Sequence, residues 1–89
     1  MTIAGNPKQL AHNIAEGYAP FTRATCRRHT PSELKTIYRN LELVVRELRG
    51  LVIPLEDIKK LQHRNQALQR ANTTLMIIRY HAKRHKIVL

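Results

Sequence analysis

The sequence has 89 residues and a formal net charge of +10, which fits one small domain over residues 1–89 and leaves no room for a second core. Cys26 is the only cysteine, so no internal disulfide can form, and this usage is typical of a reducing compartment. Arg79 interrupts the most apolar segment, so no apolar run is long enough to span a bilayer. We therefore expect an intracellular protein of the cytoplasm or nucleus, with the mitochondrion as an alternative, and no membrane partner.

The positive charge is distributed unevenly along the chain. Residues 1–30 hold four basic residues and one acidic residue. Residues 31–57 hold four basic and five acidic residues, and residues 58–89 hold eight basic residues and no acidic residue. Such segregation is typical of proteins that bind a polyanion, and we expect the polyanion to be a nucleic acid. The alternative is a basic surface that is simply solvated.

The first expected helix spans residues 7–18. Asn6 is a good N-cap residue, and Pro7 suits the first helical position because its missing N–H costs nothing there. Gly17 and Pro20 limit the helix to about three turns. A helix this short is marginal on its own, so we expect it to pack against the rest of the chain.

Residues 19–29 are expected to form a basic connector. Phe21, the only phenylalanine, is predicted to anchor the connector in the core. Arg23, Arg27 and Arg28 have two interpretations, which are a solvated loop and a basic arm that follows phosphate groups.

A second helix is predicted over residues 31–49. Thr30 and Glu33 have the spacing of a capping box, and Pro31 fits the first helical position between them. Gly50 stands where a C-terminal cap requires a left-handed residue. The helix carries an apolar stripe for the core, formed by Leu34, Ile37, Tyr38, Leu41, Val44, Val45 and Leu48.

The third and longest helix is predicted over residues 55–86, which contain neither glycine nor proline. Pro54 ends a short connection, so the second and third helices should form a helical hairpin. Leucines and asparagines recur at heptad spacing, which predicts a coiled-coil-like seam for a homodimer. The seam residues are Ile58, Leu61, Asn65, Leu68, Asn72 and Leu75. We expect the apolar segment 75–78 to overhang the shorter helix, where a second chain would cover it.

The basic face of this helix is the main candidate binding site. Lys59, His63, Gln66 and Arg70 are spaced to lie on one face and can reach phosphate oxygens or hydroxyl groups. The full set of expected nucleic-acid-binding residues is Arg23, Arg27, Arg28, Lys59, Lys60, His63, Arg64, Gln66, Arg70, Arg79, Lys83, Arg84 and Lys86.

Metal and catalytic sites are not expected. His81 and His85 are four residues apart, and Cys26 and His29 have a C-x2-H spacing, so together they could hold zinc. The surrounding positive charge argues against a cation, and we predict no metal and no cofactor. The sequence also lacks a glycine-rich phosphate loop and a nucleophile–base–acid set, which argues against an enzyme.

The sequence thus predicts an all-α protein, in which a short N-terminal helix precedes a helical hairpin that dimerises through its long basic third helix. The expected function is non-enzymatic binding of duplex or structured RNA through phosphate contacts, as in small regulatory or viral proteins that sequester RNA. RNA is favoured over DNA because no helix resembles a recognition helix and aromatic platforms for single strands are lacking. The alternatives are a coiled-coil adaptor that pairs with a larger protein or ribonucleoprotein, a DNA-binding regulator, and a membrane-surface protein that binds through residues 75–89.

Overall fold

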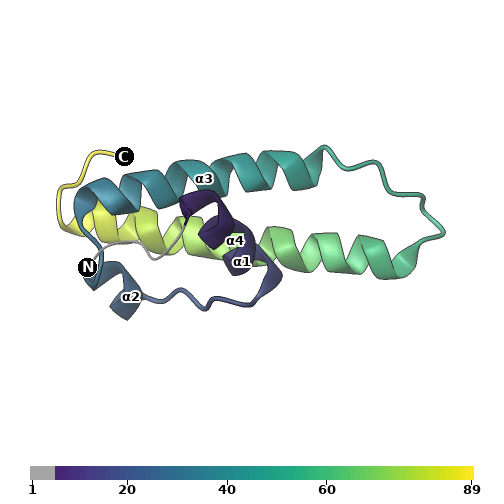
Figure 1. Ribbon diagram of the computed structural model, residues 1–89, viewed down its shortest axis with the longest axis horizontal. Coiled ribbons are helices and arrows are strands. Elements are labelled where there is room, and N and C mark those ends of the chain that lie inside the picture. Colours follow the sequence, from purple (N-terminus) through teal and green to yellow (C-terminus); the bar gives the residue numbers. More distant parts are fainter. Residues whose placement is uncertain (1–5) are drawn as a thin grey trace.

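The computed structural model describes residues 6–89, and this part of the chain forms helices and loops without a strand. The helices are α1 (Pro7–Glu16), α2 (Arg23–Arg27), α3 (Pro31–Arg49) and α4 (Ile58–Arg84). The long helices α3 and α4 run antiparallel as a hairpin, α1 lies across both, and α2 packs against the C-terminal end of α4 (Figure 1). The prediction of an all-α protein is therefore confirmed.

Helix α1 begins as the sequence predicts and ends two residues earlier than expected. The Asn6 side chain accepts a hydrogen bond from the Lys8 amide at 2.9 Å, and Pro7 occupies the first turn. Gly17 ends the helix in the left-handed region with a φ of 84°, which a residue with a Cβ rarely adopts. The packing of α1 on both α3 and α4 agrees with the expectation that this short helix docks on the hairpin.

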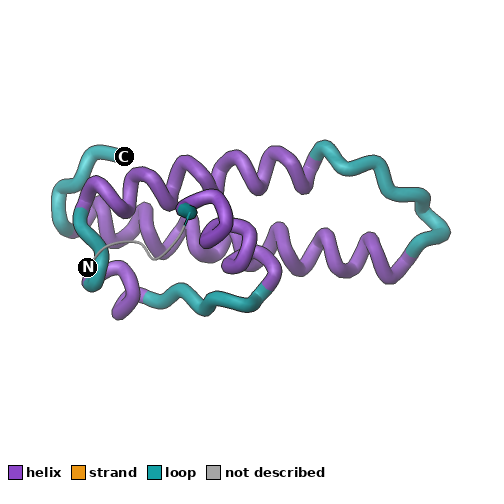
Figure 2. Tube along the Cα trace, in the orientation of Figure 1, coloured by secondary structure: helices purple, strands orange, loops and turns teal. Residues whose placement is uncertain are grey.

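The connector at residues 19–29 contains a helix that we did not predict. Thr22 and Thr25 cap it reciprocally, because each side chain bonds with the backbone amide of the other. Phe21 is buried in the core as expected, and Cys26 is completely buried. Figure 2 shows this short helix between two loop segments. The basic arm is therefore partly helical and fixed on the hairpin.

Helix α3 has the predicted bounds and the predicted N-terminal cap. The Thr30 amide donates to Glu33 Oε1 at 2.8 Å, and the Glu33 amide donates to Thr30 Oγ1 at 3.2 Å. Gly50 is an exception, because its φ of −80° is right-handed and not the left-handed conformation that we expected. The chain leaves α3 by an extended segment instead of a left-handed cap.

Helix α4 is shorter than predicted at both ends. Residues 55 and 56 form a turn, and Asp57 is the N-cap, with its carboxylate accepting from the Lys60 amide at 3.3 Å. Pro54 therefore precedes the helix and does not open it. At the other end the helix stops at Arg84, and Lys86 has a positive φ of 55°.

The overhang of α4 lies at the end opposite to the one we predicted. Its first turns extend beyond the last turn of α3, where residues 50–57 turn back (Figure 1). Leu75 and Ile78 are buried in the intramolecular core, so no second chain is needed to cover them. We expected a tight connection at residues 51–54. The observed loop is longer, and it shifts the position of α4 along α3. Four small side chains of α4 are buried alongside Leu75 and Ile78, namely Ala67, Ala71, Thr74 and Ala82.

None of the helices within residues 6–89 combines the length and the apolar character needed to cross a bilayer.

Candidate nucleic-acid interface

A cationic cavity lies between α2 and the C-terminal end of α4, and we call it the α2–α4 pocket. Its volume is about 320 Å³, and its lining residues are Arg23, Arg27, Tyr80, His81, Arg84 and His85. The capping threonines of α2 place Arg23 and Arg27 one helical turn apart, on the side that packs against α4. Within residues 6–89, no acidic side chain lines the pocket. This pocket therefore joins the two most basic segments of the sequence.

The Tyr80 ring organises the arginines of the α2–α4 pocket. Arg23 Cζ lies 4.8 Å from the Tyr80 ring centroid, and Arg84 Cζ lies 5.9 Å from the same centroid. Both distances fall within the range of a cation–π contact. Within residues 6–89, neither guanidinium forms an ion pair with a carboxylate. The two groups are thus held in place by an aromatic ring while their charges are not neutralised.

Two histidines complete the α2–α4 pocket. The ring centroids of His81 and His85 are 4.3 Å apart with an interplanar angle of 36°. Burial lowers the pKa of His81 from its ordinary value, and the positive charges of His85 and Arg27 lower it further. His81 therefore favours the neutral form unless an anion enters the pocket.

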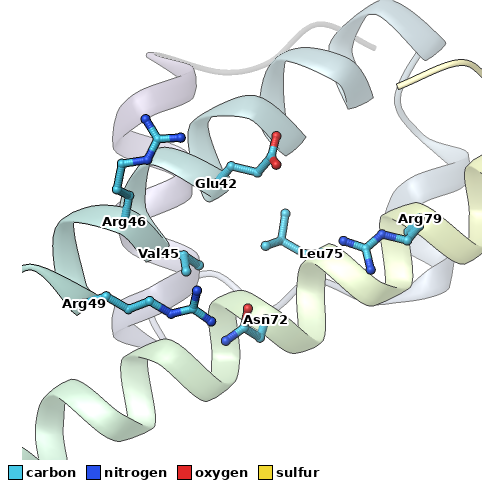
Figure 3. Close-up of a pocket in the computed structure, with 7 residues that line it drawn as sticks. All are labelled: Glu42, Val45, Arg46, Arg49, Asn72, Leu75 and Arg79. Atoms are coloured by element: carbon cyan, nitrogen blue, oxygen red, sulfur yellow. The ribbon is translucent and has the colours of Figure 1, made fainter.

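A second cavity, the α3–α4 groove, has a volume of about 410 Å³ and lies between the two long helices (Figure 3). The side chains of Arg46, Arg49 and Arg79 surround it, and Glu42 also lines it. Arg79 donates from Nη2 to the Tyr38 hydroxyl at 2.8 Å, and this hydrogen bond raises the pKa of Arg79. Because a carboxylate is present, the groove is a weaker anion site than the α2–α4 pocket.

The basic residues at the start of α4 lie near the hairpin tip, where they surround an apolar cavity of about 480 Å³. Lys60 Nζ lies 3.6 Å from Asp57 Oδ2, and His63 Nε2 lies 2.8 Å from Glu16 Oε2. Lys59 and Arg64 line the same cavity. Lys60 and His63 thus each have an acidic neighbour, and the contact of His63 with Glu16 joins α4 to α1, which the sequence alone did not indicate.

Arg70 has a structural contact that the sequence analysis did not anticipate. Its Nη1 donates to the Ala15 carbonyl oxygen at 3.2 Å, near the C-terminal end of α1. A Cβ placed on Gly17 would lie 3.1 Å from Arg70 Cζ, so the guanidinium packs closely on the α1 cap. The expected row of Lys59, His63, Gln66 and Arg70 is therefore interrupted by contacts with α1.

The remaining expected binding residues are exposed. Arg28 is the C-cap residue of α2, Lys83 lies in the last turn of α4, and Lys86 follows that helix. Gln66 is exposed on α4. The cations among them are available to extend the positive surface around the α2–α4 pocket.

The predicted seam is divided between the core and the surface. Leu75 is buried, and Leu61, Leu68 and Asn72 are half-buried, with Asn72 and Leu75 lining the α3–α4 groove. The first part of the seam stays open, because Asn65 is exposed and Ile58 is 63% exposed. The open positions of the predicted seam therefore lie in the N-terminal half of α4.

The residues considered for zinc lie around one cavity without forming a ligand set. Cys26, His29, His81 and His85 line a space of about 300 Å³. Within residues 6–89, however, no group of three or more side chains of the types that ligate metals is close enough to hold an ion. Burial raises the pKa of the Cys26 thiol, which disfavours the thiolate that zinc binds.

Sequence reasoning missed Tyr80, Arg46 and Arg49 as site residues. A usable signal existed for the first, because Tyr80 and Arg84 are four residues apart and share one helical face. Recognising α2 from the Thr22–Thr25 spacing would have placed Arg23 and Arg27 on one face as well. Comparisons with protein-family models, with curated proteins and with solved structures found no match for this chain.

Proposed function

We propose that this protein binds nucleic acid without catalysing a reaction, and that it binds duplex or structured RNA through phosphate contacts. The observation that carries the proposal is the acid-free α2–α4 pocket, where Arg23, Arg27 and Arg84 share one cavity. A guanidinium presents several N–H donors in a planar fork that matches a phosphate group. Three such groups without a carboxylate partner suit a polyanion better than they suit a structural ion-pair network.

The surface around the pocket fits a long polyanion. Arg28, Lys83 and Lys86 are exposed near the same end of the hairpin, so a phosphate backbone that leaves the pocket would meet further cations. Contacts of this kind release counterions and make the affinity strongly dependent on salt. They supply little base discrimination, because phosphate groups carry no sequence information directly.

The packing of α4 favours RNA over DNA in this proposal. Helix α4 packs against α1, α2 and α3, so it is not free along its length to enter a DNA major groove. Duplex RNA is bound mostly through its shape, its phosphates and its 2′-hydroxyl groups, which needs only spaced cations and polar side chains. A DNA-binding regulator is the alternative outcome.

Competition between duplexes tests this proposal. Double-stranded RNA and double-stranded DNA of equal length compete for the protein at one salt concentration, and we expect RNA to win with little sequence preference. Arg84→Gln should weaken RNA binding, whereas Arg39→Gln, which removes an exposed cation from α3, should have a smaller effect. A preference for one DNA sequence would instead support the DNA-binding regulator.

Assembly is a second proposal, and it rests on the hairpin tip. Val52, Leu55 and Ile58 are 97%, 85% and 63% exposed, so an apolar surface adjoins the open half of the predicted seam. We propose that this surface, together with Leu61 and Asn65, forms a homodimer. Sedimentation velocity should show a dimer at micromolar concentration, and Leu55→Lys should give a monomer.

An adaptor function is the alternative interpretation of the same tip. In that case a larger protein would cover Val52 and Leu55, and the purified chain would sediment as a monomer. The adaptor would also bind RNA and DNA equally weakly, and its residual binding would not respond to Arg84→Gln.

A further inference from the structure

We propose that the α2–α4 pocket recognises a phosphate monoester, such as the terminal phosphate of an RNA strand, in preference to an internal phosphodiester. This inference rests on the proposed function and specifies which part of the nucleic acid the pocket takes. It is carried by the charge, the size and the lining of the pocket.

The charge of the pocket exceeds what an internal phosphodiester can neutralise. Arg23, Arg27 and Arg84 contribute three guanidinium groups to the lining of the pocket. A phosphodiester carries one negative charge, whereas a phosphate monoester carries nearly two at neutral pH and has three strong acceptor oxygens. Because no acidic side chain lines the pocket, the monoester is the better match for this concentration of donors.

The volume of the pocket also favours the end of a strand. About 320 Å³ lies at the lower end of the range for small-molecule sites and is more than a phosphate group alone requires. The remaining space can take the sugar of a terminal nucleotide. Helices α2 and α4 border the cavity on two sides, so a terminal phosphate and its sugar would contact side chains from both helices.

The arginines are held in place before a ligand arrives. Arg23 and Arg84 both contact the Tyr80 ring, with Cζ-to-centroid distances of 4.8 and 5.9 Å. Such contacts reduce the conformational entropy that long side chains lose on binding. Tyr80 is therefore a positioning residue of the pocket, because it acts on the ligand through the two guanidinium groups.

The test compares one RNA duplex with a 5′-phosphate, a 3′-phosphate or only hydroxyl ends, by fluorescence anisotropy of the wild-type protein at fixed salt. We expect at least one phosphorylated form to bind about tenfold more tightly than the hydroxyl form, as for one or two added charge-assisted hydrogen bonds. Adenosine monophosphate and inorganic phosphate serve as competitors and distinguish a strand end from a free phosphate.

Two arginines provide a matched pair of variants. Arg84→Gln removes a cation that lines the pocket, and Arg39→Gln removes an exposed cation of α3 that does not. Arg84→Gln should abolish the preference for the phosphorylated duplex, and Arg39→Gln should preserve it. A Tyr80→Leu variant should reduce the preference while leaving all three guanidinium groups in the chain.

Equal affinity for phosphorylated and hydroxyl duplexes would overturn the inference, and the proposed binding of RNA through its backbone would still stand. Loss of the preference in Arg39→Gln to the same extent as in Arg84→Gln would also overturn it. If adenosine monophosphate binds and no RNA does, the monoester site is supported and the proposed function is wrong. Circular dichroism confirms that each variant is folded, and Arg27→Gln replaces Arg84→Gln if the latter is not.

Discussion

Arg70 should contribute to the stability of the fold more than to nucleic-acid binding. Its guanidinium donates to the Ala15 carbonyl at 3.2 Å and covers Gly17, so it stabilises the end of α1. Arg70→Met keeps the apolar stem and removes this hydrogen bond. We expect a loss of about 1 kcal/mol, because hydrogen bonds from charged groups are worth about 1.5–3 kcal/mol and this one is only partly buried. For a domain of this size that loss lowers Tm by roughly 4–8 °C.

Thermal unfolding followed by circular dichroism at 222 nm measures this effect, and Lys83→Met is the matched control. Lys83 is exposed on the same helix and forms no ion pair within residues 6–89, so its substitution should change stability by less than about 0.5 kcal/mol. The reasoning is refuted if Arg70→Met melts at the wild-type temperature while the dependence of log RNA affinity on log salt falls by about one. That pair of results would identify Arg70 as a phosphate contact instead of a cap.

Two further predictions concern the core and the pH dependence. Ile78→Ala should destabilise the protein by about 2–5 kcal/mol in urea titrations, independently of protein concentration, because Ile78 is fully buried within one chain. A loss of stability that appears only at concentrations where the chain dimerises would contradict the burial of Ile78 within one chain. The pKa of His81 is lower in the folded than in the unfolded chain, so the unfolded chain is protonated at a higher pH than the folded chain. The stability of the fold should therefore decrease as the pH falls below about 6.5. RNA affinity should rise over the same interval, as protonated His81 adds to the charge of Arg27 and Arg84, and His81→Gln should reduce both changes.

The sequence was informative where a local chemical signal determines the structure. The capping box of Thr30 and Glu33 and the cap at Asn6 located two helix starts correctly, since the side chain that satisfies the first amides is encoded within three residues. The apolar stripe of α3 also gave the buried face, because burial of one face follows from helical periodicity.

The arrangement of the helices relative to one another could not be predicted from the sequence in the same way. The position of α4 against α3 depends on the path of residues 50–57. In this loop Gly50 has a right-handed conformation and Asp57 caps α4, and residue type alone predicts neither feature. Because we expected a different path for this loop, we predicted the overhang at the wrong end of α4. The leucine row suggested the contact face, whereas Leu61 and Leu68 are only half-buried and small residues such as Ala67 and Ala71 are fully buried.

The residues of the candidate site could be predicted from the sequence, but their arrangement around one pocket could not. Arg23, Arg27 and Arg84 were identified from charge, although the first two are far from the third in sequence. Their convergence depends on α2, which is short enough to be missed by periodicity. Tyr80 was missed because its spacing to Arg84 is a weak signal on its own, and the contact with Arg23 depends on the fold.

The salt dependence of RNA affinity tests the central claim most directly. The dissociation constant of one RNA duplex is measured for the wild-type protein and Arg84→Gln between 50 and 300 mM KCl. If Arg23, Arg27 and Arg84 contact phosphates, log affinity should fall linearly with log salt by at least about two to three units per decade, and Arg84→Gln should lower that slope by about one. An affinity that does not change with salt, or the same slope for both proteins, would contradict phosphate-driven binding at the α2–α4 pocket.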